Sequence, residues 1–264
     1  MNITCLGTGS AFTLRNYQTN FLLTSIERKR LLIDCGSDAR HALNELHLSY
    51  KDIDTVYISH LHGDHCGGLE WLGFSTFFDP KCKKPTLYIS QQLKDKLWSE
   101  VLRGGMSSVQ SRILSLDDYF EVISIEPNGS FDWEGATFTP VQTAHIMDGF
   151  VIVPSFGLMV EHNGKRTFFT TDTQHCPSQI TDFYNMSDLI IHDCETTSFC
   201  SGVHANFDNE LSTLPSKIKS KMFLVHYQDN VLANWDVWKK KAEQAGFRGF
   251  LAKGQVYALP GTVD

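Results

Sequence analysis

Four side chains that can bind metal ions lie within six consecutive positions of this sequence. His60, His62, Asp64 and His65 follow a short apolar run in the segment VYISHLHGDHCGG. His60 and His62 are two positions apart, so in an extended loop both point to one side and can hold one metal ion through neutral imidazoles. Asp64 and His65 can reach a second ion. These polar groups would be costly to bury without a metal, so the spacing HxHxDH predicts a metal site.

Two divalent ions in one site would activate water for hydrolysis. Ions about 3.5 to 4 Å apart can share a water, lower its pKa towards about 7, and stabilise the attacking and leaving oxygens of a displacement at phosphorus. Histidine nitrogens and carboxylate oxygens suit zinc, although manganese or iron would also accept them. We therefore expect a hydrolase with two zinc ions.

Short apolar runs bounded by Gly, Asn, Asp or Pro predict the strands that position these residues. They lie near residues 2–6, 19–24, 31–34, 54–58, 86–89, 120–125, 137–142, 156–161, 166–171, 188–191, 222–225 and 255–259. Helical patterns lie near 38–47, 66–78, 90–102, 206–219 and 232–245, and residues 103–115 are expected to form a mobile loop or lid. This order fits packed sheets with helices outside, in one α/β domain over residues 1–264.

Composition and charge exclude several classes of protein. With 42% hydrophobic and 20% charged residues, the chain of 264 residues is expected to be globular. A formal net charge of -7, without a dense basic run, disfavours long nucleic acid as a partner. The seven cysteines are scattered without CxxC spacing, which fits a reducing compartment. No signal peptide or membrane span is evident, so we expect a cytoplasmic protein without a membrane partner.

The sequence resembles the metallo-β-lactamase superfamily over nearly its whole length. Residues 32–36, LIDCG, are similar to that family's early strand, which ends in a structural aspartate, here Asp34. His145, Asp172 in FFTTDT and His226 in FLVHY match the remaining ligand positions. The resemblance implies a four-layer αββα sandwich. It also implies a first metal held by His60, His62 and His145, a second held by Asp64, His65 and His226, and Asp172 as the bridging ligand.

Two further segments resemble the tRNase Z-like branch of this superfamily, which processes tRNA 3′ ends. In that branch a Glu and a His orient and protonate the leaving oxygen, and HDCETT and SGVHA are similar to the segments that carry them. The match makes His204, at the start of a helix, the general acid and Glu195 its orienting partner. Asp64 would be both a ligand and the proton acceptor for the attacking water. The simpler alternatives are a surface carboxylate at Glu195 and a His204 without a chemical role.

The chain departs from the tRNA branch between His145 and Asp172. Enzymes of that branch carry a flexible basic arm there, but positions 146–171 provide only 26 residues, most of them in two expected strands. The segments FGLM, TTDTQ, HDCETT, SGVHA and KMFLVHYQ most resemble the phage anti-Pycsar cyclic nucleotide phosphodiesterases, which lack the arm.

That resemblance implies hydrolysis of cyclic mononucleotides such as cCMP, cUMP, cAMP and cGMP, which would counteract antiphage signalling in the cytoplasm of a bacterial host. The alternatives are a tRNA 3′-processing endonuclease, a nucleotide-sequestering binding protein, and a thioester or lactam hydrolase.

The same resemblance implies a homodimer in which a partner loop closes over a small substrate. Residues 106–112 or 147–154 can supply such a loop. We interpret a nearby apolar stretch as core, with a dimer contact as the alternative; it contains Trp71, Leu72, Phe74, Phe77 and Phe78.

Overall fold

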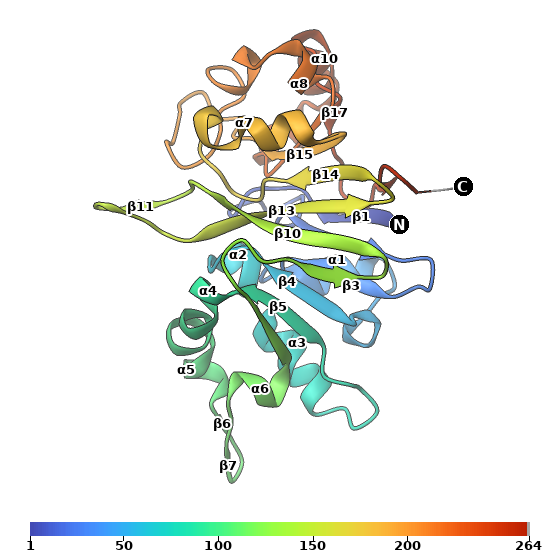
Figure 1. Ribbon diagram of the computed structural model, residues 1–264, viewed down its shortest axis with the longest axis vertical. Helices are drawn as coiled ribbons and strands as arrows, with labels where there is room; N and C mark the ends of the chain where they lie inside the picture. The colour runs from blue at the N-terminus through green and yellow to red at the C-terminus, as the bar shows by residue number, and fades with distance from the viewer. Residues whose placement is uncertain (263–264) are drawn as a thin grey trace.

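The computed structural model describes residues 1–262, and its centre consists of two seven-stranded sheets (Figure 1). From edge to edge, the first sheet contains β18 (Val256–Ala258), β1 (Asn2–Gly7), β2 (Asn20–Thr24), β3 (Arg30–Ile33), β4 (Thr55–Ile58), β5 (Thr86–Ser90) and β8 (Glu121–Ile125). The second contains β17 (Gly249–Phe250), β16 (Met222–Val225), β15 (Leu189–Asp193), β14 (Lys165–Phe169), β13 (Ser155–His162), β10 (Ala136–Thr143) and β9 (Phe131–Trp133). Two small hairpins project from this body: β6 (Ser108–Val109) with β7 (Arg112–Ile113), and β11 (Met147–Asp148) with β12 (Val151–Ile152).

Helices cover the outer face of each sheet. The first sheet is covered by α1 (Ala39–Glu45), α3 (Leu69–Phe77) and α4 (Gln91–Lys96), and the second by α7 (Pro177–Met186) and α10 (Trp235–Ala245). The shorter elements are α2 (Gly63–Cys66), α5 (Arg103–Met106), α6 (Leu116–Tyr119), α8 (Ser216–Lys219), α9 (Asp229–Ala233), the 3₁₀ turns η1 (Tyr50–Asp52) and η3 (Leu211–Thr213), and the π-helical η2 (Leu97–Leu102). Of the helices described, none has the length and apolar character needed to cross a membrane.

Alternation of side chains along the strands builds the core in layers. In β3, Leu31 and Ile33 lie in the cluster between the sheets, where they join Leu158 of the second sheet. Leu32, between them in sequence, faces the other way and packs with Leu43 of α1. Successive residues of a strand point to opposite faces, so a strand that is apolar at every position is covered on both sides. The result is the four-layer αββα sandwich expected from the sequence.

Each strand expected from the sequence is present, whereas one expected helix is wrong. Residues 206–219 form only η3 and α8. The side chain of Asn206 accepts hydrogen bonds from the backbone N–H groups of Asp208 and Asn209, which favours a turn over a helix. The expected loop at 103–115 instead contains α5 and the β6–β7 hairpin, and α7 was not anticipated. In the apolar stretch on α3, Leu72 is fully buried and its neighbours pack on the core, while Phe78 is exposed.

Several strand ends meet at one edge of the sandwich. Strands β3 and β4 are parallel in the first sheet, and β14, β15 and β16 are parallel in the second. Strand β10 also runs in that direction, because β13 lies antiparallel between β10 and β14. The loops that leave these carboxyl ends carry each metal ligand expected from the sequence.

Candidate metal centre

One group of donor atoms is formed by His60 and His62 after β4, His145 after β10 and Asp172 after β14. Nδ1 of His62 lies 3.1 Å from Nε2 of His60 and 3.2 Å from Nε2 of His145. Oδ2 of Asp172 lies 3.8 and 3.6 Å from the same two Nε2 atoms. Donors on a tetrahedral zinc ion with bonds of about 2.1 Å are about 3.4 Å apart. The four atoms therefore have the spacing of a zinc ligand set.

The second group is formed by Asp64, His65, His226 and the other oxygen of Asp172. Nε2 of His65 lies 3.2 Å from both Asp64 Oδ2 and Asp172 Oδ1. Nε2 of His226 lies 3.4 and 3.5 Å from the same oxygens. Nε2 of His65 is buried and has no hydrogen-bond partner in residues 1–262. A cation would satisfy this nitrogen, so the donor set fits a second metal ion with Asp172 shared between the two groups.

Asp34, the structural aspartate expected after β3, orients two of the metal ligands, His65 directly and His60 through Ser59. Its Oδ2 lies 2.7 Å from Nδ1 of His65 and accepts a 2.8 Å hydrogen bond from the Ser59 hydroxyl. Ser59 Oγ in turn lies 3.0 Å from Nδ1 of His60. Such outer partners fix the ring orientation and leave Nε2 for the metal. Asp34 adopts a left-handed backbone with φ of 62°, a strain typical of functional sites.

The charge of this site also favours cations. Four carboxylates are buried in it: Asp34, Asp64, Asp172 and Asp193. Burial alone would raise the pKa of Asp172, but without a cation the charged imidazoles of His226 and His65 hold that pKa well below its usual range. Burial alone would lower the pKa values of these two histidines, but the carboxylates around them raise those values well above the ordinary one. Burial keeps the pKa of His60 well below its ordinary value, so this imidazole is neutral, as a ligand must be. Buried carboxylates need compensating charge, and two divalent ions would supply it.

His204 has a different partner from the one expected. Its Nδ1 lies 2.7 Å from Oδ2 of Asp193, the last residue of β15. The carboxylate of Glu195 instead accepts a 2.9 Å hydrogen bond from the backbone N–H of Ser201. The expected pairing of Glu195 with His204 is therefore wrong, because the backbone of Glu195 pairs with Asn206 beyond the end of the strand and its side chain turns towards Ser201.

The segment that carries His204 is not the helix expected there. His204 lies in a bend that includes Gly202, which has a φ of 79°. The neighbouring Val203 carbonyl lies 2.8 Å from Nδ1 of His145, so this bend also orients a metal ligand. This bend thus contributes to the site in two ways, through the backbone carbonyl of Val203 and through the side chain of His204.

The pair of His204 and Asp193 is suited to proton transfer. Burial alone would lower the pKa of His204, but the Asp193 carboxylate raises it above the ordinary value. With Nδ1 bonded to Asp193, Nε2 is left for a substrate, and the ring centre lies 4.7 Å from that of His226. The sequence reasoning missed Asp193, although a usable signal was present. Like Asp34 and Asp172, it stands at the carboxyl end of a parallel strand.

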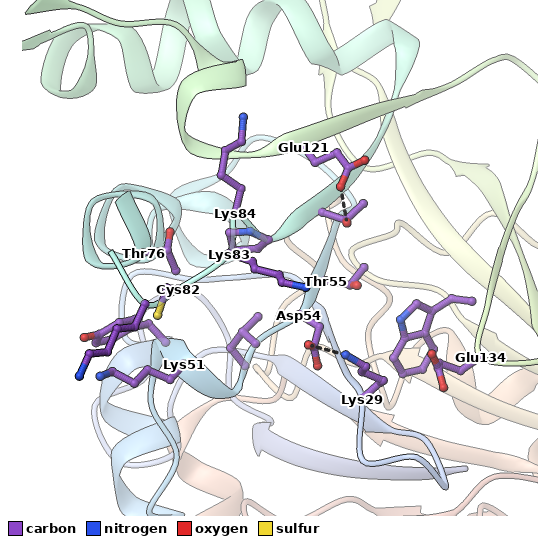
Figure 2. A pocket seen from close by; sticks show the side chains of 16 residues that line it. Lys29, Lys51, Asp54, Thr55, Thr76, Cys82, Lys83, Lys84, Glu121 and Glu134 are labelled. Carbon is purple, nitrogen blue, oxygen red and sulfur yellow. Dashed lines mark hydrogen bonds and ion pairs between the residues drawn. The ribbon is translucent and has the colours of Figure 1, made fainter. Parts of the chain in front are cut away.

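Cavities open on two sides of the metal groups. One, of about 370 Å³, is lined by His204 and His226, and another, of about 290 Å³, by His60, His62 and His145. A further cavity of about 590 Å³ lies at the opposite edge, beside Thr55, which begins the strand that leads to His60. Figure 2 shows that there Lys29 is paired with Asp54. In the described residues, no group of side chains spaced to hold a metal ion lines that third cavity.

Two facing sheets with these donor groups at one edge define a protein of the metallo-β-lactamase fold. YhfI of Bacillus subtilis, a protein of that fold, has a TM-score of 0.72 at 18% identity, covering 97% of this chain and 99% of that one. Human tRNase Z, short form, has a TM-score of 0.68 at 19% identity, covering 98% and 100%. Zn(2+)-bound PqqB from Methylobacterium extorquens has a TM-score of 0.74 at 15% identity, covering 98% and 100%.

Sequence comparison then identifies the family. The family model of the Anti-Pycsar protein Apyc1 matches residues 1–257. The Anti-Pycsar protein Apyc1 of Bacillus phage vB_BveM-Goe7 is 33% identical over 239 residues, which cover 87% of this chain and 90% of the relative. That of Paenibacillus harenae is 34% identical over 233 residues, covering 88% and 91%. The chain belongs to the Anti-Pycsar protein Apyc1 family, which confirms the resemblance found in its sequence.

Proposed function

We propose that this protein is a phosphodiesterase that hydrolyses cyclic mononucleotides, such as cCMP, cUMP, cAMP and cGMP, to nucleoside monophosphates. The observation that carries the proposal is the arrangement of both donor groups next to the pair of His204 and Asp193. Membership of the Anti-Pycsar family supports it. In the cytoplasm of a bacterial host, this reaction would counteract cyclic-nucleotide antiphage signalling.

Two zinc ions, with manganese or iron as alternatives, would lower the pKa of a water and neutralise phosphate charge when bound. One ion would be held by His60, His62 and His145, and the other by Asp64, His65 and His226, with Asp172 contributing one oxygen to each group. His62 is the exposed member of the set, so the first group is open to a substrate.

The chain's own residues would manage the protons. Asp64 accepts a proton from the water whose oxygen bonds to phosphorus. His204 donates its Nε2 proton to the ribose oxygen as the phosphorus–oxygen bond breaks, and the electron pair of that bond passes to the oxygen. Asp193 holds Nδ1 and stabilises the imidazolium before transfer. Glu195 supports this arrangement indirectly through the backbone of Ser201. One water and one cyclic diester become a monoester with a free hydroxyl.

A tRNA 3′-processing endonuclease is the second candidate, because the segment with His204 resembles that branch of the superfamily. The chain between His145 and Asp172 is taken up by β11, β12, β13 and β14, which leaves no long basic arm. The net charge of -7 is also unfavourable for a long phosphate backbone. These observations favour the smaller substrate.

We also propose that the protein forms a homodimer through the β11–β12 hairpin. The hairpin follows His145 almost directly, and it exposes Met147, Val151 and the whole side chain of Phe150. Apolar side chains gathered on a projecting element are typical of an interaction site. Residues 106–112, the other segment that could supply such a loop, fit less well, because Met106 is fully buried. Phe150→Asp should shift a dimer towards monomer in analytical ultracentrifugation, and a monomeric wild-type protein would contradict the proposal.

One experiment tests the proposed reaction against its alternatives. Purified protein of measured metal content is incubated with a panel of cyclic nucleotides and with a precursor tRNA. We expect a nucleoside monophosphate from at least one cyclic mononucleotide, with loss of activity in His60→Ala and Asp64→Ala. His41→Ala, an exposed histidine on α1, is the matched control.

Two other outcomes would contradict the proposed reaction. Cleavage of the precursor tRNA at low enzyme concentration, without nucleotide turnover, would favour the endonuclease. Stoichiometric loss of free nucleotide without product would favour a sequestering protein.

A further inference from the structure

The cavity of about 370 Å³ beside His204 has the features of a binding site rather than of a gap between loops. Its volume lies within the range of about 300 to 1,000 Å³ that small-molecule sites occupy. His204 and His226 are among the residues that line it. Phe12, from the loop after β1, and Phe199, from the loop after β15, contribute to its lining and are strongly exposed, at 93% and 63%.

The loop that carries Phe12 is held in place by α9. The Asp229 carboxylate accepts hydrogen bonds from the Thr13 hydroxyl and, at 3.0 Å, from the backbone N–H of Leu14. The backbone N–H of Ser10 also donates to the Tyr227 carbonyl at 3.1 Å. Because hydrogen bonds already hold this loop, its exposed phenyl ring is available to a ligand. Binding would therefore cost little conformational entropy for ordering the loop.

The loop that carries Phe199 is held equally well. The buried amide of Asn206 donates 3.1 Å hydrogen bonds to the carbonyls of Thr197 and Phe199. Beneath it, the side-chain oxygen of Gln228 accepts from the backbone N–H and the hydroxyl of Thr196. That leaves the amide nitrogen of Gln228, also on the cavity wall, without a hydrogen-bond acceptor in the described residues. The wall thus offers two phenyl rings and, among its polar groups, the amide nitrogen of Gln228.

The proposed chemistry decides which cavity receives the nucleoside. The leaving oxygen that His204 would protonate belongs to the ribose, so the ribose and base must lie on the His204 side of the metal groups. The cavity of about 290 Å³ on the other side is bordered by Leu61, Leu93, Val101 and Val153, and its lining includes no Phe, Tyr or Trp; its aromatic rings are those of the metal-site histidines. Stacking on aromatic side chains is the common way in which proteins hold a base that is not paired.

We propose that the cavity between the Phe12 and Phe199 loops is the nucleoside subsite, with both phenyl rings stacking against the base and Gln228 Nε2 donating a hydrogen bond to the nucleoside. This inference rests on the proposed function, because it takes the substrate to be a cyclic mononucleotide. Stacking discriminates little between bases, because every base has an aromatic face. The subsite should therefore accept both purines and pyrimidines.

The test compares substrates that differ only in the base. The ratio of kcat/KM for cAMP or cCMP to that for 1-deoxyribose 3,5-cyclic phosphate, which lacks a base, is measured in wild type, Phe12→Ala and Phe199→Ala. Each substitution should lower this ratio about tenfold, mainly through KM for the nucleotide. Phe12→Trp should restore it. Leu14→Ala, an exposed side chain in the same loop, is the matched control and should leave the ratio unchanged.

Binding separates this inference from the proposed reaction. Affinities for AMP and CMP are measured by calorimetry on wild type and both alanine variants, without turnover. If no cyclic nucleotide is hydrolysed but AMP binds about tenfold more weakly to the variants, the reaction is wrong and the subsite stands. Normal turnover with an unchanged substrate ratio in both variants would overturn the subsite alone. No hydrolysis of any cyclic nucleotide together with no binding of AMP or CMP would overturn both.

Discussion

Asp193 lies between two histidines with different tasks. Its Oδ2 lies 2.7 Å from Nδ1 of His204, and its Oδ1 lies 3.3 Å from Nδ1 of His226, a ligand of the second metal group. The backbone N–H of Thr173 donates a further 2.9 Å hydrogen bond to Oδ2. Asp193 is therefore a positioning residue, since it acts on the substrate and on the metal only through the two imidazoles.

Asp193→Asn should lower kcat about 100-fold or more, because a neutral amide cannot stabilise the imidazolium of His204. Glu195→Gln should have a smaller effect, because the Glu195 carboxylate contacts Ser201 and not His204. Both variants are assayed at saturating zinc with metal content measured, since loss of an outer partner can weaken metal binding about 10- to 100-fold. A larger fall in kcat for Glu195→Gln than for Asp193→Asn would instead support Glu195 as the residue that orients His204.

His192 makes stability depend on pH. Burial lowers its pKa to about 4, against the weaker opposing effect of its contact with the Asp193 carbonyl. Its Nε2 lies 2.5 Å from the Tyr184 hydroxyl, so the folded state holds a neutral ring. Because the folded pKa is below the unfolded value of about 6.5, the stabilisation is complete above pH 6.5 and is lost as the pH falls towards 4.

Between pH 6.5 and 4, the free energy of unfolding should fall by on the order of 3 kcal/mol because of His192. This contribution should be absent from His192→Gln, because glutamine does not titrate. Urea unfolding of both proteins at a series of pH values, with chelator present so that metal release does not contribute, gives the difference directly. Parallel curves for the two proteins between pH 6.5 and 4 would disprove the assignment.

At the scale of elements, the ligand loop depends on close backbone contacts. A Cβ added at Gly36, after β3, would lie 2.1 Å from the Asp64 carbonyl oxygen in α2. A Cβ at Gly68, before α3, would lie 2.3 Å from the Gly36 carbonyl oxygen. Backbone cannot yield as a flexible side chain does, so these two glycines set how closely the β3 loop approaches the helix with Asp64 and His65.

Gly36→Ala should displace α2 and reduce bound metal, with a fall in Tm of several degrees. Gly63→Ala, in the same ligand loop, is the matched control, because a Cβ there meets nothing within 4 Å. Metal analysis and thermal unfolding of the two variants check this expectation. Equal metal content in Gly36→Ala and Gly63→Ala would show that the close approach is dispensable.

At the scale of the whole molecule, the metal groups join the two sheets. His60, His62, Asp64 and His65 come from the segment that follows β4 of the first sheet, whereas His145, Asp172 and His226 follow strands of the second. Both donor groups therefore draw on both halves of the sandwich, and ions bound there would favour the native packing of the sheets.

Removal of metal should lower Tm by about 5 °C or more. Ions at 100 times their dissociation constant stabilise the native state by about 2.7 kcal/mol, and about 2 to 4 °C follow from each kcal/mol in a protein of this size. Differential scanning calorimetry before and after chelation, and after zinc or manganese is restored, measures the change. The same treatment of a His60→Ala and His226→Ala double variant should change little, and an equal shift there would point to ions bound elsewhere.

The sequence by itself determined the strands and the contiguous part of the site. Short apolar runs bounded by Gly, Asn, Asp or Pro show which segments form strands, and His60 to His65 are so close in sequence that no fold can separate them. His145, Asp172 and His226 came from family resemblance, since no local pattern relates three such distant positions.

Only the tertiary structure decided which carboxylate holds His204 and which loops enclose the nucleoside. Asp193 and Glu195 are two positions apart, and the choice between them depends on the backbone pairing of Glu195 with Asn206. Phe12 and Phe199 lie on one cavity because Asp229 and Asn206 tie their loops in place. These contacts are side-chain and backbone hydrogen bonds between separate segments, and hydrophobic periodicity carries no information about them.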